Sequence, residues 1–427
     1  MVVDTMSILM LVLFAINIPI GFSVLAVSLF YFFITGQLDP IIGVQRMLGG
    51  AQSSTLLAIP FFVLLGSLMN YTGISKRMLN LAETLTGHLP GGLAQVNVVL
   101  AMLMGGLSAS SLADAAMQTK MLVPEMEKRG YDRGFAAAVI ASAAQITPII
   151  PPGIGLILFG FLANVSIGKM FMAGILPGLL MTVLNMTAVH WVSKRRGYLP
   201  TKEKPPTVKQ VGIASKDAFW ALFLVIVIIG GVRIGIYTPT EAGAIACFYV
   251  MIIGLFVYKE MKVIDIKGAI LEAVRSTSSI MIIIMAASGF AWILTWEGVA
   301  QNITSFVTTF STSPTVFMIA INIFLLVVGC FIEGNASMIV LIPLLLPTVL
   351  SLGINPVYFG IVMIINLAIG TLTPPMGTVM LLISGLTGVK VDKFTRELLP
   401  FYVANIVALL LITFIPTISL LLPNAMN

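Results

Sequence analysis

Four short segments combine glycine or proline with hydroxyl, amide or carboxyl side chains inside strongly apolar sequence. A proline pair ends the hydrogen-bond ladder of a helix and frees carbonyl oxygens, while Ser, Thr and Asn add neutral oxygen ligands. Helix carboxyl ends also carry partial negative charge, so such segments suit an alkali cation such as Na⁺. We name them the first tip (Gly105 to Ser111), the first break (Thr147 to Gly153), the second tip (Gly329 to Ser337) and the second break (Gly370 to Gly377).

One tip with one break in each half of the chain predicts at least two cation sites. A single serine is as well explained by a hydroxyl bonded back to its own helix, but the paired placement favours binding. The residues assigned to the first site are Ser108, Ser110, Ser111 and Thr147. Those assigned to the second are Gly334, Asn335, Thr371 and Thr373.

Two acidic residues, Asp114 and Glu333, fall well inside the segments that carry the tips. An ionisable group deep in apolar sequence indicates a functional site. Glu333 could serve as a cation ligand, a proton carrier or a hydrogen-bond partner of the substrate, whereas Asp114 could instead cap a helix. The expected substrate contacts are Ser108, Ser110, Ser111, Glu333 and Asn335.

The composition requires these segments to be positioned within a membrane. Of 427 residues, 58% are hydrophobic and 9% charged, whereas soluble proteins carry about 25% charged residues. The chain lacks a glycine-rich phosphate loop and a nucleophile elbow, so we expect no enzymatic activity and no ATP hydrolysis, and the composition also excludes nucleic-acid binding. Apolar runs long enough to cross a bilayer are Met6 to Ile34, Ala218 to Val232, Ala242 to Tyr258, Pro314 to Ile332 and Phe401 to Leu422.

A single ungapped shift of the chain along itself places prolines of the first half on prolines of the second. Similar hydrophobic composition would align leucines by chance, but it would not align prolines, which are only 22 of the 427 residues. The alignment indicates two duplicated halves. The matched pairs are Pro124 with Pro347, Pro151 with Pro374, Pro152 with Pro375, and Pro177 with Pro400.

Basic residues give each half an orientation, because Lys and Arg are retained on the cytoplasmic side. Basic residues flank the segment 91–126, so we expect a re-entrant hairpin that enters from the cytoplasm. The segments on either side of 314–350 contain no Lys or Arg, which predicts a hairpin that enters from outside. The two halves would then be inverted repeats, an arrangement common in secondary transporters.

Each half is expected to contain one crossing, one hairpin, one proline-broken helix and one closing helix. The broken helices should span about 134–164 and 356–387. Short amphipathic helices at 74–88 and 299–313 should lie along opposite membrane surfaces as arms. A polar connector at 193–217 separates the halves. With no arginine placed to bind an anion at the midplane, a carboxylate substrate would depend on helix amino ends and bound cations.

Several motifs together resemble the large membrane subunit of tripartite ATP-independent periplasmic (TRAP) transporters, and the resemblance covers essentially the whole chain. The residues that carry it are Leu57-Ala-Ile-Pro-Phe-Phe, Gly329 to Glu333, Leu345-Leu-Pro, Gly370 to Gly377, Ile175-Leu-Pro-Gly and Leu398-Leu-Pro-Phe.

The resemblance implies Na⁺-driven uptake of an organic acid across the bacterial inner membrane. It also implies two partners, a soluble periplasmic substrate-binding protein and a small four-helix membrane subunit, and an elevator mechanism. Scaffold helices would lie in 1–90 and 217–312, the moving transport domain in 91–192 and 313–427, and the connector in 193–216.

The resemblance further implies residues for two sodium sites. The first would use Gly105, Gly106, Ser108, Ser111 and Thr147, and the second Gly334, Asn335, Gly370, Thr371 and Thr373. Glu333 stands where many members have aspartate, which leaves its role open.

The substrate class stays open between sialic acid and C4-dicarboxylates, and the serine-rich first tip favours sialic acid. Two other functions remain alternatives at this point: an ion-coupled organic anion transporter that needs no binding protein, and an anion channel.

Overall fold

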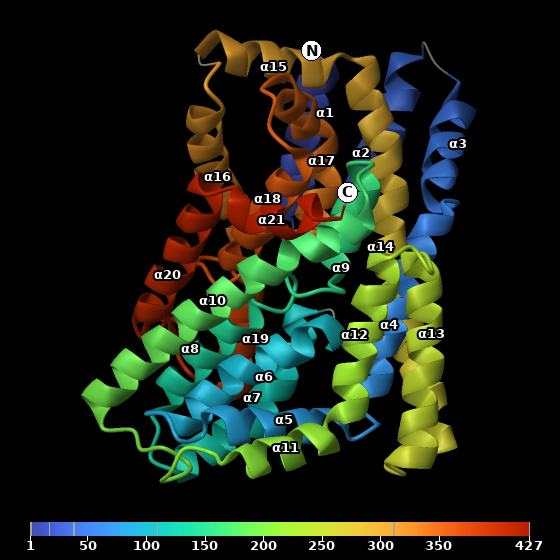
Figure 1. Ribbon diagram of the computed structural model, residues 1–427. Helices are drawn as coiled ribbons and strands as arrows, with labels where there is room; N and C mark the ends of the chain where they lie inside the picture. Colours follow the sequence, from blue (N-terminus) through green and yellow to red (C-terminus); the bar gives the residue numbers. More distant parts are fainter. Residues whose placement is uncertain (1, 17, 37–38, 109, 311, 427) are drawn as a thin grey trace.

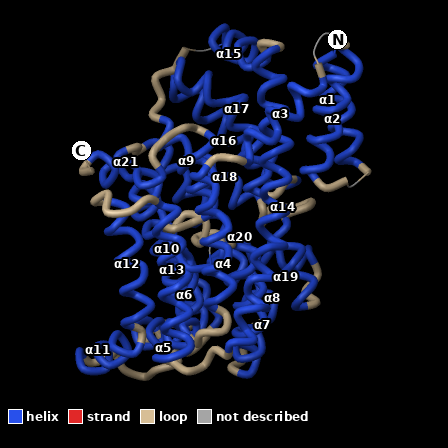
Figure 2. Tube along the Cα trace, turned by 90° about the vertical axis from the view of Figure 1, so that its right-hand side faces the viewer, coloured by secondary structure: helices blue, strands red, loops and turns tan. Residues whose placement is uncertain are grey.

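The computed structural model describes residues 2–16, 18–36, 39–108, 110–310 and 312–426. These residues form helices joined by loops, without a β-strand (Figures 1 and 2). Within these ranges, six helices are long and apolar enough to cross a membrane, or up to eight if two bent helix pairs each form one span. The prediction of an all-α polytopic membrane protein is confirmed.

The first half of the chain contains the crossing, arm, hairpin and broken helix in the expected order. We call the pair α6–α7 the first hairpin, and the first break lies between α8 and α9. The helices are α4 (Ala58–Met69), α5 (Ile74–Thr86), α6 (Gly92–Ser108), α7 (Ser111–Lys128), α8 (Arg133–Ala144), α9 (Ile154–Leu162) and α10 (Ile167–Arg196).

The second half repeats this order of elements. The pair α16–α17 is the second hairpin, and the second break lies between α18 and α19. The helices are α14 (Val263–Trp296), α15 (Val299–Phe310), α16 (Pro314–Phe331), α17 (Gly334–Ser351), α18 (Pro356–Gly370), α19 (Thr378–Thr387) and α20 (Val391–Phe414).

The remaining elements include two that differ from the sequence expectation. The apolar run from Met6 to Ile34 is divided into two helices, because Pro19 has no backbone N–H to continue a helix. The connector is partly helical, since Thr207 and Gln210 form a capping box that starts α11. These elements are α1 (Val2–Ala15), α2 (Ile20–Thr35), α3 (Pro40–Ala51), η1 (Ser54–Leu57), α11 (Val208–Asp217), α12 (Phe219–Arg233), α13 (Pro239–Ile252), η2 (Ile253–Val257) and α21 (Thr417–Asn424).

Helix starts recur at the same offset that aligned the prolines. Asp132 accepts hydrogen bonds from the second and third backbone N–H groups that follow it at the start of α8, and Asn355 does the same for α18. The matched prolines also occupy matching elements: Pro124 lies within α7 and Pro347 within α17. Two copies of one unit would give this pattern.

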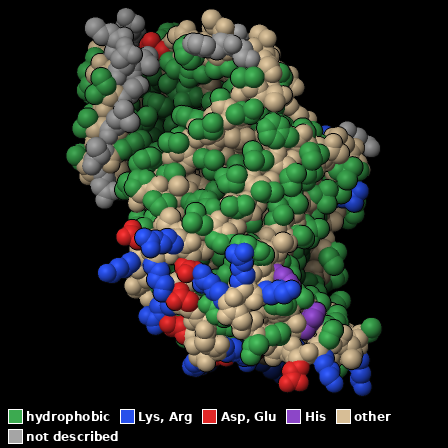
Figure 3. Space-filling view, turned by 90° about the vertical axis from the view of Figure 1, so that its left-hand side faces the viewer, with side chains coloured by type: hydrophobic (Ala, Val, Ile, Leu, Met, Phe, Trp, Pro, Cys, Tyr) green, Lys and Arg blue, Asp and Glu red, His purple; other side chains and the backbone are tan. Residues whose placement is uncertain are grey.

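The two hairpins lie at opposite ends of the molecule (Figure 1). The arm α5 runs across the lower end beside the first hairpin, and α15 runs across the upper end beside the second. Lys and Arg side chains gather at the lower end on the face shown in Figure 3. Because Lys and Arg are retained on the inner side of a membrane, we take the lower end as cytoplasmic.

The first parts of the two broken helices form the centre of the protein. Every residue of α8 from Gly134 to Ala144 is buried, as is every residue of α18 from Val357 to Gly370. A helix that is apolar and buried on all sides has protein rather than lipid or water around it. The first break is therefore largely buried, and the second begins in the interior at Thr371 and Leu372, whereas its Pro374, Pro375 and Met376 are exposed.

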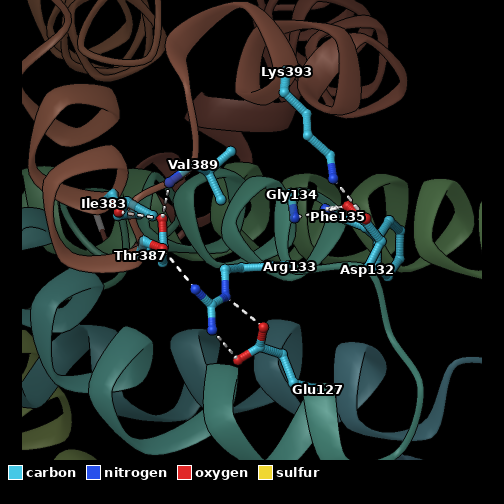
Figure 4. Close-up of polar contacts among 9 residues, drawn as sticks. All are labelled: Glu127, Asp132, Arg133, Gly134, Phe135, Ile383, Thr387, Val389 and Lys393. Carbon is cyan, nitrogen blue, oxygen red and sulfur yellow. Dashed lines mark hydrogen bonds and ion pairs between the residues drawn. The ribbon is translucent and has the colours of Figure 1, made fainter.

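Charged contacts join the two halves at the cytoplasmic end (Figure 4). Arg133 pairs with Glu127 and donates to the carbonyl oxygen of Thr387 at 3.3 Å. Lys393 donates to Asp132 at 2.7 Å. Partial burial alone would raise the pKa of Asp132, but the hydrogen bonds from Lys393 and from two backbone N–H groups outweigh it and hold this pKa below its ordinary value.

Candidate functional site

The tips of the two hairpins are built alike, with a polar side chain capping the helix that follows. The Ser110 hydroxyl accepts the backbone N–H of Ala113 at the start of α7. Glu333 accepts the backbone N–H of Ala336 at the start of α17 at 3.1 Å, and its second carboxylate oxygen accepts from the Asn335 amide at 3.0 Å. Two helix amino ends are thus capped, one by a neutral group and one by an acidic group.

One small cavity, of about 50 Å³, lies between the two tips. Six of the predicted site residues line it, so the fold brings together positions from opposite halves of the chain. None of the lining residues is Lys or Arg, which agrees with the absence of an arginine at the expected midplane. The lining residues are Ser110, Ser111, Leu112, Pro148, Gly155, Glu333, Gly334, Asn335, Met338, Ile364, Leu367, Ala368 and Thr371.

The first break separates α8 from α9 and places Thr147 against a buried carboxylate. The Thr147 hydroxyl donates to Asp114 at 2.6 Å, and Asp114 is only 1% exposed. The first tip packs directly on this break: a Cβ added to Gly105 would lie 3.0 Å from the Cα of Thr147. A Cβ on Gly106 would overlap the carbonyl oxygen of Pro151, so glycine is required for this approach.

The second break is held by a different set of hydroxyl contacts. The Thr371 hydroxyl lies 2.7 Å from the Ala368 carbonyl oxygen, and the Thr373 hydroxyl donates to the Ile369 carbonyl oxygen at 3.2 Å. The Tyr402 hydroxyl of α20 donates to Thr373. The proline pair of each break is joined by a cis peptide bond.

Glycine again permits close packing between the second tip and the second break. A Cβ added to Gly329 would lie 3.0 Å from the Cα of Gly370. The predicted residues therefore separate into a group around the cavity and a group at the breaks. The second group is Gly105, Gly106, Thr147, Gly370 and Thr373. The side chain of Ser108 lies outside the described part of the structure.

Two residues at the breaks were missed in the sequence, and a third, Asp114, was singled out by its depth but left open between a functional and a capping role. Gln145 lies two residues before Thr147 and Tyr402 directly follows the Leu398-Leu-Pro-Phe motif, but each makes its contact with a residue far away in the chain, which the local sequence does not reveal. Asp114 accepts the Thr147 hydroxyl. Its depth in apolar sequence was the only signal for this contact.

The donor set at the breaks fits a hard cation. Hydroxyl and carbonyl oxygens, with the Asp114 carboxylate at the first break, are the ligands that alkali and alkaline-earth ions prefer. Among the described residues, no group of three or more His, Cys, Asp or Glu side chains could hold a metal ion.

The sequence matches the model of a transporter family along nearly its whole length. The model for the DctM component of the tripartite ATP-independent periplasmic transporter matches residues 7–418. The 2,3-diketo-L-gulonate TRAP transporter large permease protein YiaN of Escherichia coli is 39% identical over 407 residues, covering 95% of each chain. The sialic acid TRAP transporter large permease protein SiaM of Vibrio cholerae is 37% identical over 410 residues, covering 96% of this chain and 95% of that protein.

A third relative is named for a different class of substrate, the C4-dicarboxylates. The C4-dicarboxylate TRAP transporter large permease protein DctM of Pseudomonas aeruginosa is 36% identical over 375 residues, which is 87% of this chain and 86% of that protein. These relatives are named as transport proteins rather than enzymes.

Among solved structures, the YdaH transporter of Alcanivorax borkumensis shares the fold. Its TM-score is 0.65 at 13% sequence identity, and the match covers 87% of this chain and 86% of that chain. A likeness at this identity concerns the fold alone. The family match, the curated relatives and the helical architecture agree: this chain belongs to the tripartite ATP-independent periplasmic transporter family as its large inner-membrane permease, the DctM component.

Proposed function

We propose that this permease couples the entry of Na⁺ to the uptake of an organic acid anion that a periplasmic binding protein delivers. The observation that carries the proposal is the cavity between the two tips, which lies next to oxygen donors at both breaks and lacks Lys and Arg. An anion in such a cavity has only helix amino ends, amide and hydroxyl groups as partners.

The electrostatics of the cavity explain why a cation is needed. Glu333 already places a carboxylate at the amino end of α17. A substrate carboxylate that enters the same space brings a negative charge into a medium of low dielectric constant, which is unfavourable unless a cation accompanies it. Coupling of the anion to Na⁺ then follows from charge balance.

We infer an elevator mechanism in which the two hairpins and the two broken helices move as one body, 91–192 with 313–427. The close glycine contacts between each tip and its break support this grouping, because packing without intervening side chains resists sliding. The helices of 1–90 and 217–312 would form the scaffold. A small four-helix membrane subunit would steady the scaffold, and the periplasmic binding protein would dock at the outer end.

For the substrate we propose a carboxylic acid that carries several hydroxyl groups, of the sialic acid class. Ser110, Ser111 and Asn335 line the cavity and offer both donors and acceptors to substrate hydroxyls. Two of the relatives carry names for acids of this kind, sialic acid and 2,3-diketo-L-gulonate. A C4-dicarboxylate, named for a third relative, is the competing class.

Uptake into reconstituted vesicles tests the proposal. The full system contains this permease, the small membrane subunit, the binding protein and a radiolabelled acid, and each component is omitted in turn. We expect uptake only when all three proteins and an inward Na⁺ gradient are present. Uptake by the permease alone would indicate a transporter that needs no binding protein. Downhill flux without Na⁺ would indicate a channel.

A further inference from the structure

The two broken helices contact each other at their carboxyl ends through one pair of side chains. Gln145 is the C-cap residue directly after α8 and Thr371 the one directly after α18, and the Thr371 hydroxyl donates to Oε1 of Gln145 at 3.1 Å. Gln145 is 0% and Thr371 5% exposed. The contact therefore lies in the interior, where a hydrogen bond is stronger than it is in water.

Each member of the pair is also held by its own helix. The Gln145 amide donates to the Ala141 carbonyl oxygen at 2.9 Å, which fixes the direction in which Oε1 points. The Thr371 hydroxyl lies within bonding distance of both Oε1 of Gln145 and the Ala368 carbonyl oxygen. The single hydroxyl proton of Thr371 is thus shared between two acceptors. A cation bound to the Thr371 oxygen would therefore alter the hydrogen bond from this hydroxyl to Gln145.

Each member also lies beside one of the two candidate cation sites. Gln145 precedes Thr147 by two residues, and Thr147 donates to Asp114 at the first break. Thr371 is itself a candidate donor at the second break and lines the cavity. Two side-chain hydrogen bonds, Thr147 to Asp114 and Thr371 to Gln145, are therefore joined by the short backbone segment from Gln145 to Thr147.

We propose that the Gln145–Thr371 hydrogen bond couples the two cation sites, so that occupation of one raises the Na⁺ affinity of the other. The Thr371 hydroxyl becomes a stronger donor when its oxygen also holds a cation, and Gln145 transmits the change to the end of α8. Gln145 acts as a positioning residue. This inference rests on the proposed function, since it requires both breaks to bind Na⁺.

Binding of radiolabelled Na⁺ to the purified permease tests the coupling without any transport step. Total ionic strength is held constant with a large organic cation. We expect a Hill coefficient above 1 for the natural chain, because two coupled sites approach a value of about 2. Gln145→Leu removes the acceptor at similar volume. It should lower the coefficient to about 1 and raise the half-saturating Na⁺ concentration by about fivefold or more.

Gln118→Leu is the matched control, because Gln118 is also fully buried but lies on α7, and its side-chain amide makes no hydrogen bond with the residues described. It should keep the cooperativity of the natural chain. If Gln145→Leu does not fold, Gln145→Asn keeps an amide at the same position but withdraws its oxygen by one methylene group. The same loss of cooperativity is expected for Gln145→Asn.

The outcomes separate this inference from the function on which it rests. A natural chain that binds no Na⁺ overturns the proposed function and the coupling together. Na⁺ binding with a Hill coefficient of about 1 in the natural chain overturns the coupling alone. So does cooperativity that survives in Gln145→Leu or Gln145→Asn, or that is lost equally in Gln118→Leu.

Discussion

Ser110 and Glu333, which occupy equivalent positions in the two halves of the chain, cap the two half-helices that face the central cavity, and each accepts the backbone N–H of the residue three positions further on. The two ends of the cavity therefore have the same backbone geometry but differ by one carboxylate. The cavity therefore has one acidic end and one neutral end, whereas two identical tips would make its two ends equivalent.

Replacing Glu333 by glutamine separates its charge from its capping role. The carboxamide oxygen of Glu333→Gln can still accept the Ala336 N–H, so thermal stability should stay close to that of the natural chain. Na⁺-driven uptake should fall by about tenfold or more, equivalent to about 1.4 kcal/mol. Uptake into vesicles over a Na⁺ titration is the measurement. A natural rate and Na⁺ dependence in this variant would remove Glu333 from the site.

The matched control for that variant lies at the opposite tip. Ser110→Ala removes a neutral cap and should cost about 0.5–2 kcal/mol of stability. Comparing the two variants by thermal unfolding shows whether a loss of transport at either tip is only a loss of folding.

Thr373 is predicted to act at the second break together with Tyr402. Thr373→Ala should raise the Na⁺ concentration needed for half-maximal uptake by about tenfold, since it removes a candidate oxygen ligand worth about 1.4 kcal/mol. Tyr402→Phe leaves that oxygen in place and removes only the hydroxyl that donates to it, so its effect should have the same direction and a smaller size. The same Na⁺ titration in both variants as in the natural chain would contradict the assignment.

The ion pair between Asp132 and Lys393 should make stability depend on pH. Because the pKa of Asp132 in the folded protein is below its ordinary value of 3.8, its contribution is complete above that pH. The contribution is lost as the pH falls through the lowered pKa.

Asp132→Asn is the substitution of choice, since Asn355 shows that asparagine caps the equivalent helix. Half-exposed ion pairs are weak, so we expect a decrease in Tm of only about 1–2 °C at pH 7. The difference from the natural chain should shrink as the pH falls from 3.8 through the lowered pKa of Asp132. Thermal unfolding in lipid nanodiscs at pH 7 and at successively lower pH values measures it, and a difference that grows on acidification would show the opposite linkage.

The orientation of the two arms can be tested by labelling. Cys247 and Cys330 are buried, so a membrane-impermeant maleimide should react only with introduced cysteines. Asn302→Cys, on the exposed face of α15, should be labelled in intact spheroplasts. Lys204→Cys, in the connector, should be labelled only after permeabilisation. Labelling in the reverse order would invert the topology.

Much of the architecture could be predicted because it depends on local signals. Proline pairs end helices wherever they occur, since proline lacks the N–H that the ladder needs. The two breaks, the two hairpins and the two arms were therefore located to within a few residues of their bounds in the structure. The division of the N-terminal run and the helix in the connector were missed, although Pro19 and the Thr207–Gln210 capping box were signals for them.

The candidate site was predictable only in part, because some of its contacts join side chains from helices that are far apart in the sequence. Ser110, Ser111, Glu333, Asn335 and Thr371 were chosen from their residue types, and the fold brings all five to one cavity. The partners at the breaks were not found in the same way. Asp114 was singled out by its depth, with a capping role as the alternative, but its contact with Thr147 was not predicted, and neither Gln145 nor Tyr402 was singled out.

The sequence by itself determined that this chain crosses a membrane, where its helices are interrupted and which end carries the positive charge, because composition, proline and lysine act through local or additive effects. Only the tertiary structure decided that Thr147 meets Asp114 and that Gln145 meets Thr371. In a chain this apolar, the side of a helix that faces lipid and the side that faces protein have nearly the same hydrophobicity. The periodicity of the sequence therefore cannot say which helices lie side by side, and close packing and buried hydrogen bonds settle it.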